Sequence, residues 1–479
     1  MAIWDFAGRI ANFGVVFGVG VILTRLLAPA EFGTFAIAVA VISFSAIFVD
    51  LGFRSAIIQA REVTQEQLST IFYLNLAAAV GLFGIFFFTA GIVERFYEIA
   101  GLQKYIVAAS GLFIINALAL IPGGLLQKNL EFKKISVIST AAAAFSGSLS
   151  LYLAFSGFGV WALVIQQLIS AGLIFLGVSF YAKWLPSFKF DLVSIKELWR
   201  YGVRIFASGI VDTVFSRMDV FVIGKVFPIQ TLGFYNRAQT LDSLIKNFAA
   251  STTTSIAFSV ISKMADDLEL VRVFYRRCLN VVAFLAFLLV GILFLTCFDI
   301  VIILFTDKWE TVGFYFRIMA VTGFVYPLSA LMVNVISARG NSKAFLKLEL
   351  IKKCILFPTY LSFFLGGIYF FLVVTGIAFL AALVANAVYL EKEIAVGAKE
   401  QVWTIFKYGI IGVVGVAIVF VITRPIDNIY VHLIVSSFAF GTLYLGFCYK
   451  LKLSGFFEIY DRVLSFYNDK RYANISSAA

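Results

Sequence analysis

Apolar runs of about 20 residues, separated by short polar loops, follow one another along this 479-residue chain. About 20 mainly apolar residues in a helix span the roughly 30 Å hydrocarbon core of a bilayer, because each residue adds about 1.5 Å. The sequence therefore predicts an all-α integral membrane protein with about fourteen transmembrane helices. The predicted spans are 5–27, 33–56, 68–92, 102–125, 133–156, 158–181, 200–225, 231–258, 274–298, 311–337, 346–365, 367–389, 402–423 and 429–449.

The composition supports a lipid-covered surface. Hydrophobic residues make up 61% of the chain and charged residues only 14%, whereas soluble proteins carry roughly 25% charged residues. Phenylalanine alone contributes 54 residues. A water-facing surface of this size needs more charge, so much of the chain must face hydrocarbon.

The basic residues predict the orientation. With the first loop placed outside, 25 Lys and Arg fall in the predicted cytoplasmic loops and C-terminal tail, against six in the outer loops. Cytoplasmic loops of membrane proteins carry such an excess. Both termini are therefore expected in the cytoplasm. The net charge of +11 then reflects membrane orientation, and no nucleic-acid partner is expected.

Several kinds of chemistry lack a sequence signal. The four cysteines show no CxxC spacing, and His432 is the single histidine, so neither a metal site nor a disulfide framework is indicated. No GxxxxGK[ST] stretch occurs, and the longest loop, near 182–199, has about 18 residues. We therefore expect no cofactor, no ATP hydrolysis and no enzymatic activity.

Two segments near the start of the chain recur about 200 residues later. Residues 9–14 and 204–209 both read R-I-x-x-x-G, and residues 29–38 and 228–238 share Pro, a short spacer and G-x-x-x-x-A. Six spans, an even number, separate the copies, so both copies run in the same direction through the membrane. Parallel repeats of this kind are typical of transporters, with the substrate path between the halves.

This repeat predicts the domain organisation. Residues 1–182 would form an N-terminal six-helix lobe, and residues 196–390 a second lobe made of spans seven to twelve. Residues 400–450 would add two helices, and 451–479 would form a cytoplasmic tail. The two lobes are expected to surround a central cavity.

Five short segments carry a family resemblance. Residues 22–33 (ILTRLLAPAEFG), 50–59 (DLGFRSAIIQ), 72–76 (FYLNL), 217–219 (RMD) and 232–238 (LGFYNRA) resemble blocks of the Wzx-type polysaccharide flippases. These proteins belong to the multidrug/oligosaccharidyl-lipid/polysaccharide exporter superfamily. The match is specific in these blocks and loose over the rest of the chain.

The resemblance implies a fold and a function. Such proteins have two six-helix bundles around a V-shaped cavity, and the glycan flippases carry two further helices. They move undecaprenyl-pyrophosphate-linked oligosaccharide units across the bacterial cytoplasmic membrane. A lipid-linked glycan substrate, membrane lipid, and glycan polymerase and chain-length partners are therefore expected, with the chain itself a monomer.

Two predicted helices carry a polar stripe on one face. At about 100° per residue, the members of each stripe point the same way. The stripe of the seventh span contains Arg204, Ser208, Asp212 and Asp219, and that of the eighth span contains Tyr235, Gln239, Asp242, Lys246 and Thr253. Charges within spans are costly and usually face a cavity or a partner, so both stripes predict a cavity wall.

These positions suggest roles in transport. Cations of fixed position would offset the desolvation of a pyrophosphate, and the candidates are Arg9, Arg204, Lys246 and Arg317. In the flippases that the chain resembles, an arginine matching Arg9 belongs to the substrate cavity. Sugars would be contacted by Tyr235, Gln239 and Asn75. Without an ATP site, ion exchange is the natural energy source, and the carboxylates that could carry the ion are Asp50, Asp212, Asp219 and Asp242.

Other interpretations remain open at this stage. Asp242 and Lys246 are four residues apart and could simply neutralise each other. A small-molecule (multidrug) exporter of the same superfamily is the nearest alternative function, although such exporters usually have about twelve spans. A membrane glycan polymerase or ligase is a further alternative, and it would typically need a large outer loop.

Overall fold

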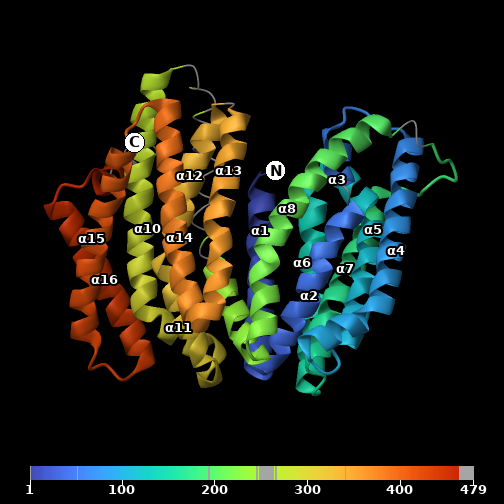
Figure 1. Cartoon of the computed structure of the whole chain (residues 1–479), viewed down its shortest axis with the longest axis horizontal. Coiled ribbons are helices and arrows are strands. Elements are labelled where there is room, and N and C mark those ends of the chain that lie inside the picture. Colours follow the sequence, from blue (N-terminus) through green and yellow to red (C-terminus); the bar gives the residue numbers. More distant parts are fainter. Residues whose placement is uncertain are drawn as a thin grey trace, which may run out of the picture. The chain divides into compact units, whose positions relative to one another are not determined.

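A computed structural model describes residues 2–50, 52–191, 195–243, 246, 261, 264, 267–339 and 341–462. Within this part of the chain the secondary structure is helical and contains no β-strand, which confirms the all-α prediction. The chain divides into two compact units, Met1–Asn236 and Arg237–Ala479 (Figure 1). The predicted limits of the lobes at 182 and 196 stay predictions.

The first unit consists of long helices and one short one. They are α1 (Ala2–Leu26), α2 (Pro29–Asp50), α3 (Phe53–Gln59), α4 (Gln65–Tyr97), α5 (Leu102–Lys128), α6 (Phe132–Phe155), α7 (Val160–Ala182) and α8 (Lys196–Val226). Residues 229–243 form a further helix that starts in this unit. α5 packs against α4 and α7, and α6 packs against α1 and α7.

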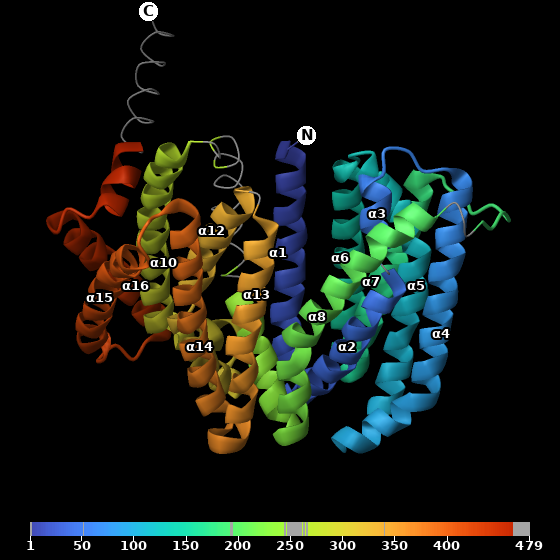
Figure 2. The ribbon, with the colours of Figure 1, turned by 45° about the horizontal axis from the view of Figure 1, so that its top comes forward.

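The second unit is built around one helix of 38 residues, α10 (Leu268–Phe305). The others are α11 (Glu310–Val321), α12 (Val325–Ala338), α13 (Ser342–Leu356), α14 (Ser362–Ile394), α15 (Ala398–Thr423) and α16 (Ile429–Lys450). α10 packs against α11, α12, α15 and α16, and α15 and α16 lie beside it in both views of the ribbon (Figures 1 and 2). The two helices predicted as an addition therefore share a core with α10.

Nine helical segments in the described part of the chain are long and apolar enough to cross a membrane. Two shorter apolar helices, Ile10–Leu26 and Pro29–Ser43, lie at the first two predicted spans. One of the nine, Ala344–Ile394, covers two predicted spans, and much of the predicted span 231–258 lies outside the described residues. The multi-span architecture is confirmed, and the total of fourteen stays a prediction.

Three interruptions place the helix ends. Gly367 adopts non-helical angles (φ 74°, ψ −167°), and α13 and α14 pack against each other on either side of it. This confirms the predicted break between 346–365 and 367–389. The second predicted span ends earlier than expected, because α2 stops at Asp50 and Gly52 turns the chain with φ 75°. The tenth span was expected to be continuous, but it is two helices separated by residues 322–324.

Polar caps satisfy the free backbone groups at several helix starts. Thr64 and Gln67 form a capping box at the start of α4, while Asp267 and Asn428 accept backbone N–H groups at the starts of α10 and α16. A helix start leaves amide groups without partners in its own turn. These caps lie at the ends of apolar helices, where the chain leaves the hydrocarbon.

The loop that follows α7 is fastened to the first turns of α4. The Trp184 indole N–H donates to Gln65 Oε1 at 2.7 Å, the Ser187 backbone N–H donates to Ser69 Oγ at 2.9 Å, and Lys189 pairs with Glu66 at 2.8 Å. This ion pair raises the pKa of Lys189. The connection between α7 and α8 is therefore held along most of its length.

The side chain of Phe440 packs α16 against α10 and α15. Its ring is fully buried and lies where a Cβ on Gly291 would come within 2.0 Å and a Cβ on Gly415 within 3.0 Å. Its ring also stacks on Tyr444, with 5.6 Å between centroids. Glycines on α10 and α15 thus leave the room that this one side chain fills.

Replacing Phe440 by alanine should destabilise the second unit. The substitution leaves a cavity between α10, α15 and α16, and we expect a loss of about 3 kcal/mol, near the lower end for a buried Phe, because packing is the main force between helices in lipid. Thermal unfolding in detergent measures this loss. Phe438→Ala is the matched control, because Phe438 is 76% exposed. An equal shift of the unfolding midpoint in both variants would contradict this packing role of Phe440.

Candidate functional site

The structure brings together two residues predicted for different roles, Asp219 and Tyr235. The Tyr235 hydroxyl donates to Asp219 Oδ2 at 2.6 Å, and the Val220 backbone N–H donates to Asp219 Oδ1 at 2.8 Å. Asp219 is 7% exposed and Tyr235 is 5% exposed. The bond links α8 to the helix at 229–243 and gives the buried carboxylate a neutral donor.

Asp242 and Lys246 form an ion pair on one helical face. Lys246 Nζ lies 2.5 Å from Asp242 Oδ2 and 5.4 Å from the centroid of the Phe379 ring on α14. Asp242 is buried, and the Lys246 side chain is 20% exposed. The structure therefore contains the ion pair in which these two side chains neutralise each other. Both charges nevertheless lie inside the protein.

Arg317 lies in the last turns of α11, close to the interruption between α11 and α12. Its Nε–H donates to the Phe294 carbonyl at 3.1 Å, and its guanidinium lies 4.9 Å and 4.5 Å from the ring centroids of Phe294 and Phe298. Aromatic faces attract cations in this geometry. Arg317 forms no ion pair with a described carboxylate, so its charge is held by rings and a carbonyl.

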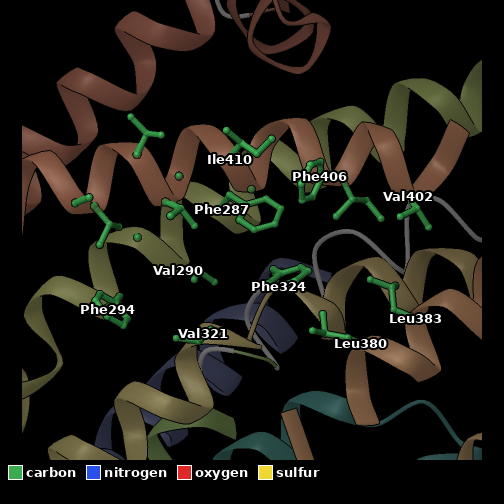
Figure 3. A pocket seen from close by; sticks show the side chains of 18 of the residues that line it. Phe287, Val290, Phe294, Val321, Phe324, Leu380, Leu383, Val402, Phe406 and Ile410 are labelled. Carbon is green, nitrogen blue, oxygen red and sulfur yellow. The ribbon is translucent and has the colours of Figure 1, made fainter. Parts of the chain in front are cut away.

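A cavity of about 1030 Å³ opens beside this arginine. Aliphatic and aromatic side chains of α10, α14 and α15 line it, including Phe287, Leu383 and Phe406 (Figure 3). Arg317 is the one charged residue among the described residues of its wall. The cavity therefore combines a long apolar surface with a single cation.

The two predicted amide ligands lie on separate helices. Asn75 on α4 is fully buried, and neither of its amide atoms has a hydrogen-bond partner among the described residues. Gln239 is partly exposed, one turn after Tyr235. A buried amide without hydrogen-bond partners costs free energy. A polar ligand or a bound water that supplied such partners would remove this cost.

Four other predicted residues can be placed only by their backbone. Arg9, Asp50, Arg204 and Asp212 lie in α1, α2 and α8, but their side chains are outside the described part of the structure. Their assignment as cavity cations and ion carriers stays a prediction.

Sequence reasoning missed one buried ion pair, between a carboxylate and the histidine. His432 Nδ1 on α16 lies 2.5 Å from Asp299 Oδ2 on α10, and Asp299 is 6% exposed. The sequence marked His432 only as the single histidine. The available signal was Asp299 itself, because a carboxylate within an apolar run needs a partner.

The sequence matches the model of a family described as polysaccharide biosynthesis protein over residues 22–314. It is 27% identical over 307 residues to the teichuronic acid biosynthesis protein TuaB of Bacillus subtilis, covering 62% of each chain. It is 21% identical over 355 residues to the lipopolysaccharide biosynthesis protein WzxC of Escherichia coli, covering 72% of this chain and 71% of that protein. The match thus spans about three fifths of the length of TuaB.

Two solved structures share the fold. The lipid II flippase MurJ, in an inward closed conformation, superposes with a TM-score of 0.76 and 14% identity, covering 93% of this chain and 99% of that chain. An inward-facing multidrug resistance MATE transporter gives a TM-score of 0.60 with 12% identity over 83% of this chain and 99% of that chain. At these identities the likeness concerns the fold alone.

Neutralising Asp242 alone should be worse than neutralising the pair. Asp242→Asn leaves the Lys246 ammonium without its counter-charge, and we expect a loss of about 3 kcal/mol. The double variant Asp242→Asn/Lys246→Met should recover most of it, measured as the midpoint of thermal unfolding. Lys189→Met, at the exposed pair with Glu66, should leave the midpoint unchanged. A double variant no more stable than Asp242→Asn would contradict the coupling.

Proposed function

This chain belongs to the polysaccharide biosynthesis protein family, and we propose that it flips a lipid-linked oligosaccharide from the cytoplasmic to the outer leaflet of the bacterial cytoplasmic membrane. The carrier of the glycan would be undecaprenyl pyrophosphate. Transport would proceed by alternating access, with both chain termini in the cytoplasm. The solved structures that share its fold include a flippase and a transporter, which agrees with the expectation that the chain is not an enzyme.

The observation that carries this proposal is the apolar cavity with Arg317 in its wall. A polyisoprenyl pyrophosphate combines a long hydrocarbon chain with an anionic head. The chain needs an apolar surface, and the head needs a cation when it leaves water. The wall of the cavity contains both an apolar surface and one cation, Arg317. Arginine suits the head because its planar guanidinium matches phosphate oxygens.

The buried carboxylates support ion coupling as part of the proposal. Asp219 and Asp242 are each buried, and each has a polar side chain as a partner, a tyrosine hydroxyl for Asp219 and an ammonium for Asp242. A carboxylate in such a place can exchange a proton or a sodium ion when its partner moves. We propose an antiport mechanism that uses one of them. Glycan polymerase and chain-length proteins are the proposed partners, and the protein would act as a monomer.

Deleting the gene tests the direction of transport. We expect lipid-linked oligosaccharide to accumulate on the cytoplasmic leaflet, because synthesis continues while flipping stops. The measurement is the susceptibility of the glycan to a hydrolase added outside intact spheroplasts, compared with lysed ones. Accumulation on the outer leaflet would contradict flipping and point to a polymerase.

Arg317→Gln tests the cavity. We expect glycan export to fall about tenfold or more, because one charge-assisted bond to a desolvated phosphate is worth roughly 1.5–3 kcal/mol. Arg317→Lys should keep part of the activity. Lys407→Gln is the matched control, since Lys407 is exposed on α15 and contacts the Trp403 ring outside the cavity. Unchanged export in Arg317→Gln, at normal protein level, would remove Arg317 from the substrate path.

A further inference from the structure

The start of α2 and the start of the helix at 229–243 approach each other at two glycines. A Cβ added to Gly33 would lie 2.1 Å from the Ile229 carbonyl oxygen, and a Cβ added to Gly233 would lie 1.9 Å from the Pro29 carbonyl oxygen. Real Cβ atoms do not come this close to oxygen. The atoms in the way are backbone, which cannot turn aside as a side chain can.

This contact is reciprocal, and it follows the sequence repeat. Gly33 and Gly233 are 200 residues apart, as are the residues that supply the two oxygens, Pro29 and Ile229. Burial repeats at the same offset: Ala38 and Ala238 are both fully buried, and Phe32 and Leu232 are 1% and 0% exposed. The two repeats therefore meet through equivalent surfaces, as the two partners of an isologous contact do.

The surrounding contacts fix the crossing. α2 packs against α8, and the start of α2 lies beside the end of α8 in both views (Figures 1 and 2). A Cβ on Gly224, near the end of α8, would lie 2.8 Å from Ile37 Cδ1 of α2. The bond between Tyr235 and Asp219 holds the helix at 229–243 to α8. Pairs of small residues let helix backbones come this close in membranes.

We propose that the Gly33–Gly233 crossing is the outer closure of the transport path, formed when the protein is open to the cytoplasm and separated when it is open to the outside. The proposal rests on the proposed function, because the orientation rule places both helix starts at the outer face and alternating access requires a closure there. Opening this contact also requires α2 to part from the end of α8, since the two helices pack against each other.

Alanine distinguishes a closure from a permanent packing contact. In the crossed state a methyl group at position 33 or 233 meets a backbone oxygen and is excluded. In a state with the helices apart, alanine favours the helix more than glycine does. Gly33→Ala and Gly233→Ala should therefore shift the population toward the outward-open state without unfolding the protein.

The experiment measures access from outside. A reporter cysteine replaces Gln239, two turns beyond the crossing, in a chain whose four native cysteines are changed to alanine. A membrane-impermeant maleimide is added to intact cells. We expect the labelling rate to rise about tenfold or more in Gly33→Ala and in Gly233→Ala, with protein levels near that of the parent.

Gly177→Ala is the matched control. A Cβ there would lie 2.6 Å from Ile138 Cγ2, so it adds the same methyl group at a close helix contact inside the first repeat, between α7 and α6, where the neighbouring atom belongs to a side chain. It should leave labelling unchanged. Unchanged labelling in both crossing variants would overturn the proposal. So would their failure to accumulate while Gly177→Ala does, because the crossing would then be needed in every state.

The result is independent of the substrate. Labelling requires no glycan, so a closure that opens as expected would stand even if gene deletion left the lipid-linked oligosaccharide unaffected. In that case the proposed function would fail and the closure would not.

Discussion

Hydrocarbon offers no hydrogen-bond partner to a peptide group, and the rest of this structure depends on that constraint. Each backbone segment in the membrane must satisfy its own N–H and C=O groups, so it is helical and can stop only where other groups take over. The chain stops at such places: at Gly52, where α3 approaches α8 closely enough that a Cβ would meet the Gly202 carbonyl at 2.4 Å, at residues 322–324, and at Gly367. The same constraint acts on side chains. Asp219, Asp242 and Asp299 each have a partner, in a hydroxyl, an ammonium and an imidazole.

The functional features lie where this constraint is met in an unusual way. Arg317 has rings and a carbonyl around its charge where an exposed arginine would have water. Asn75 keeps two buried amide atoms without partners among the described residues. The crossing at Gly33 and Gly233 brings two backbones together without side chains between them. The unpaired Asn75 amide costs free energy in isolation, and a transporter can recover that cost by binding a polar ligand.

Much of the fold could be predicted from the sequence, because length and hydropathy are local properties. The apolar runs predicted the helices, and the predicted boundary between 346–365 and 367–389 coincides with the non-helical angles of Gly367. The break after Val321 was not predicted, because hydropathy alone reads residues 311–337 as one apolar helix. Its local signals were Gly323, which lies in the interruption, and Pro327, which lies in the first turn of α12. For the candidate site, helical periodicity within a single helix predicted that Asp242 and Lys246, which are one turn apart, could neutralise each other. It could not pair Asp299 with His432, because 133 residues separate them, and Asp299 in its apolar run indicates only that some partner is needed.

The fastened loop after α7 has a mechanical consequence. A linker without such bonds would gain or lose conformational entropy whenever the helices that it joins changed their tilt. Residues 184–191 have already lost that freedom, because backbone and side-chain bonds secure them to α4 and ordering costs about 1–2 kcal/mol per residue. The conformational entropy of residues 184–191 would therefore neither oppose nor favour a movement of α8. These residues would move together with the first turns of α4.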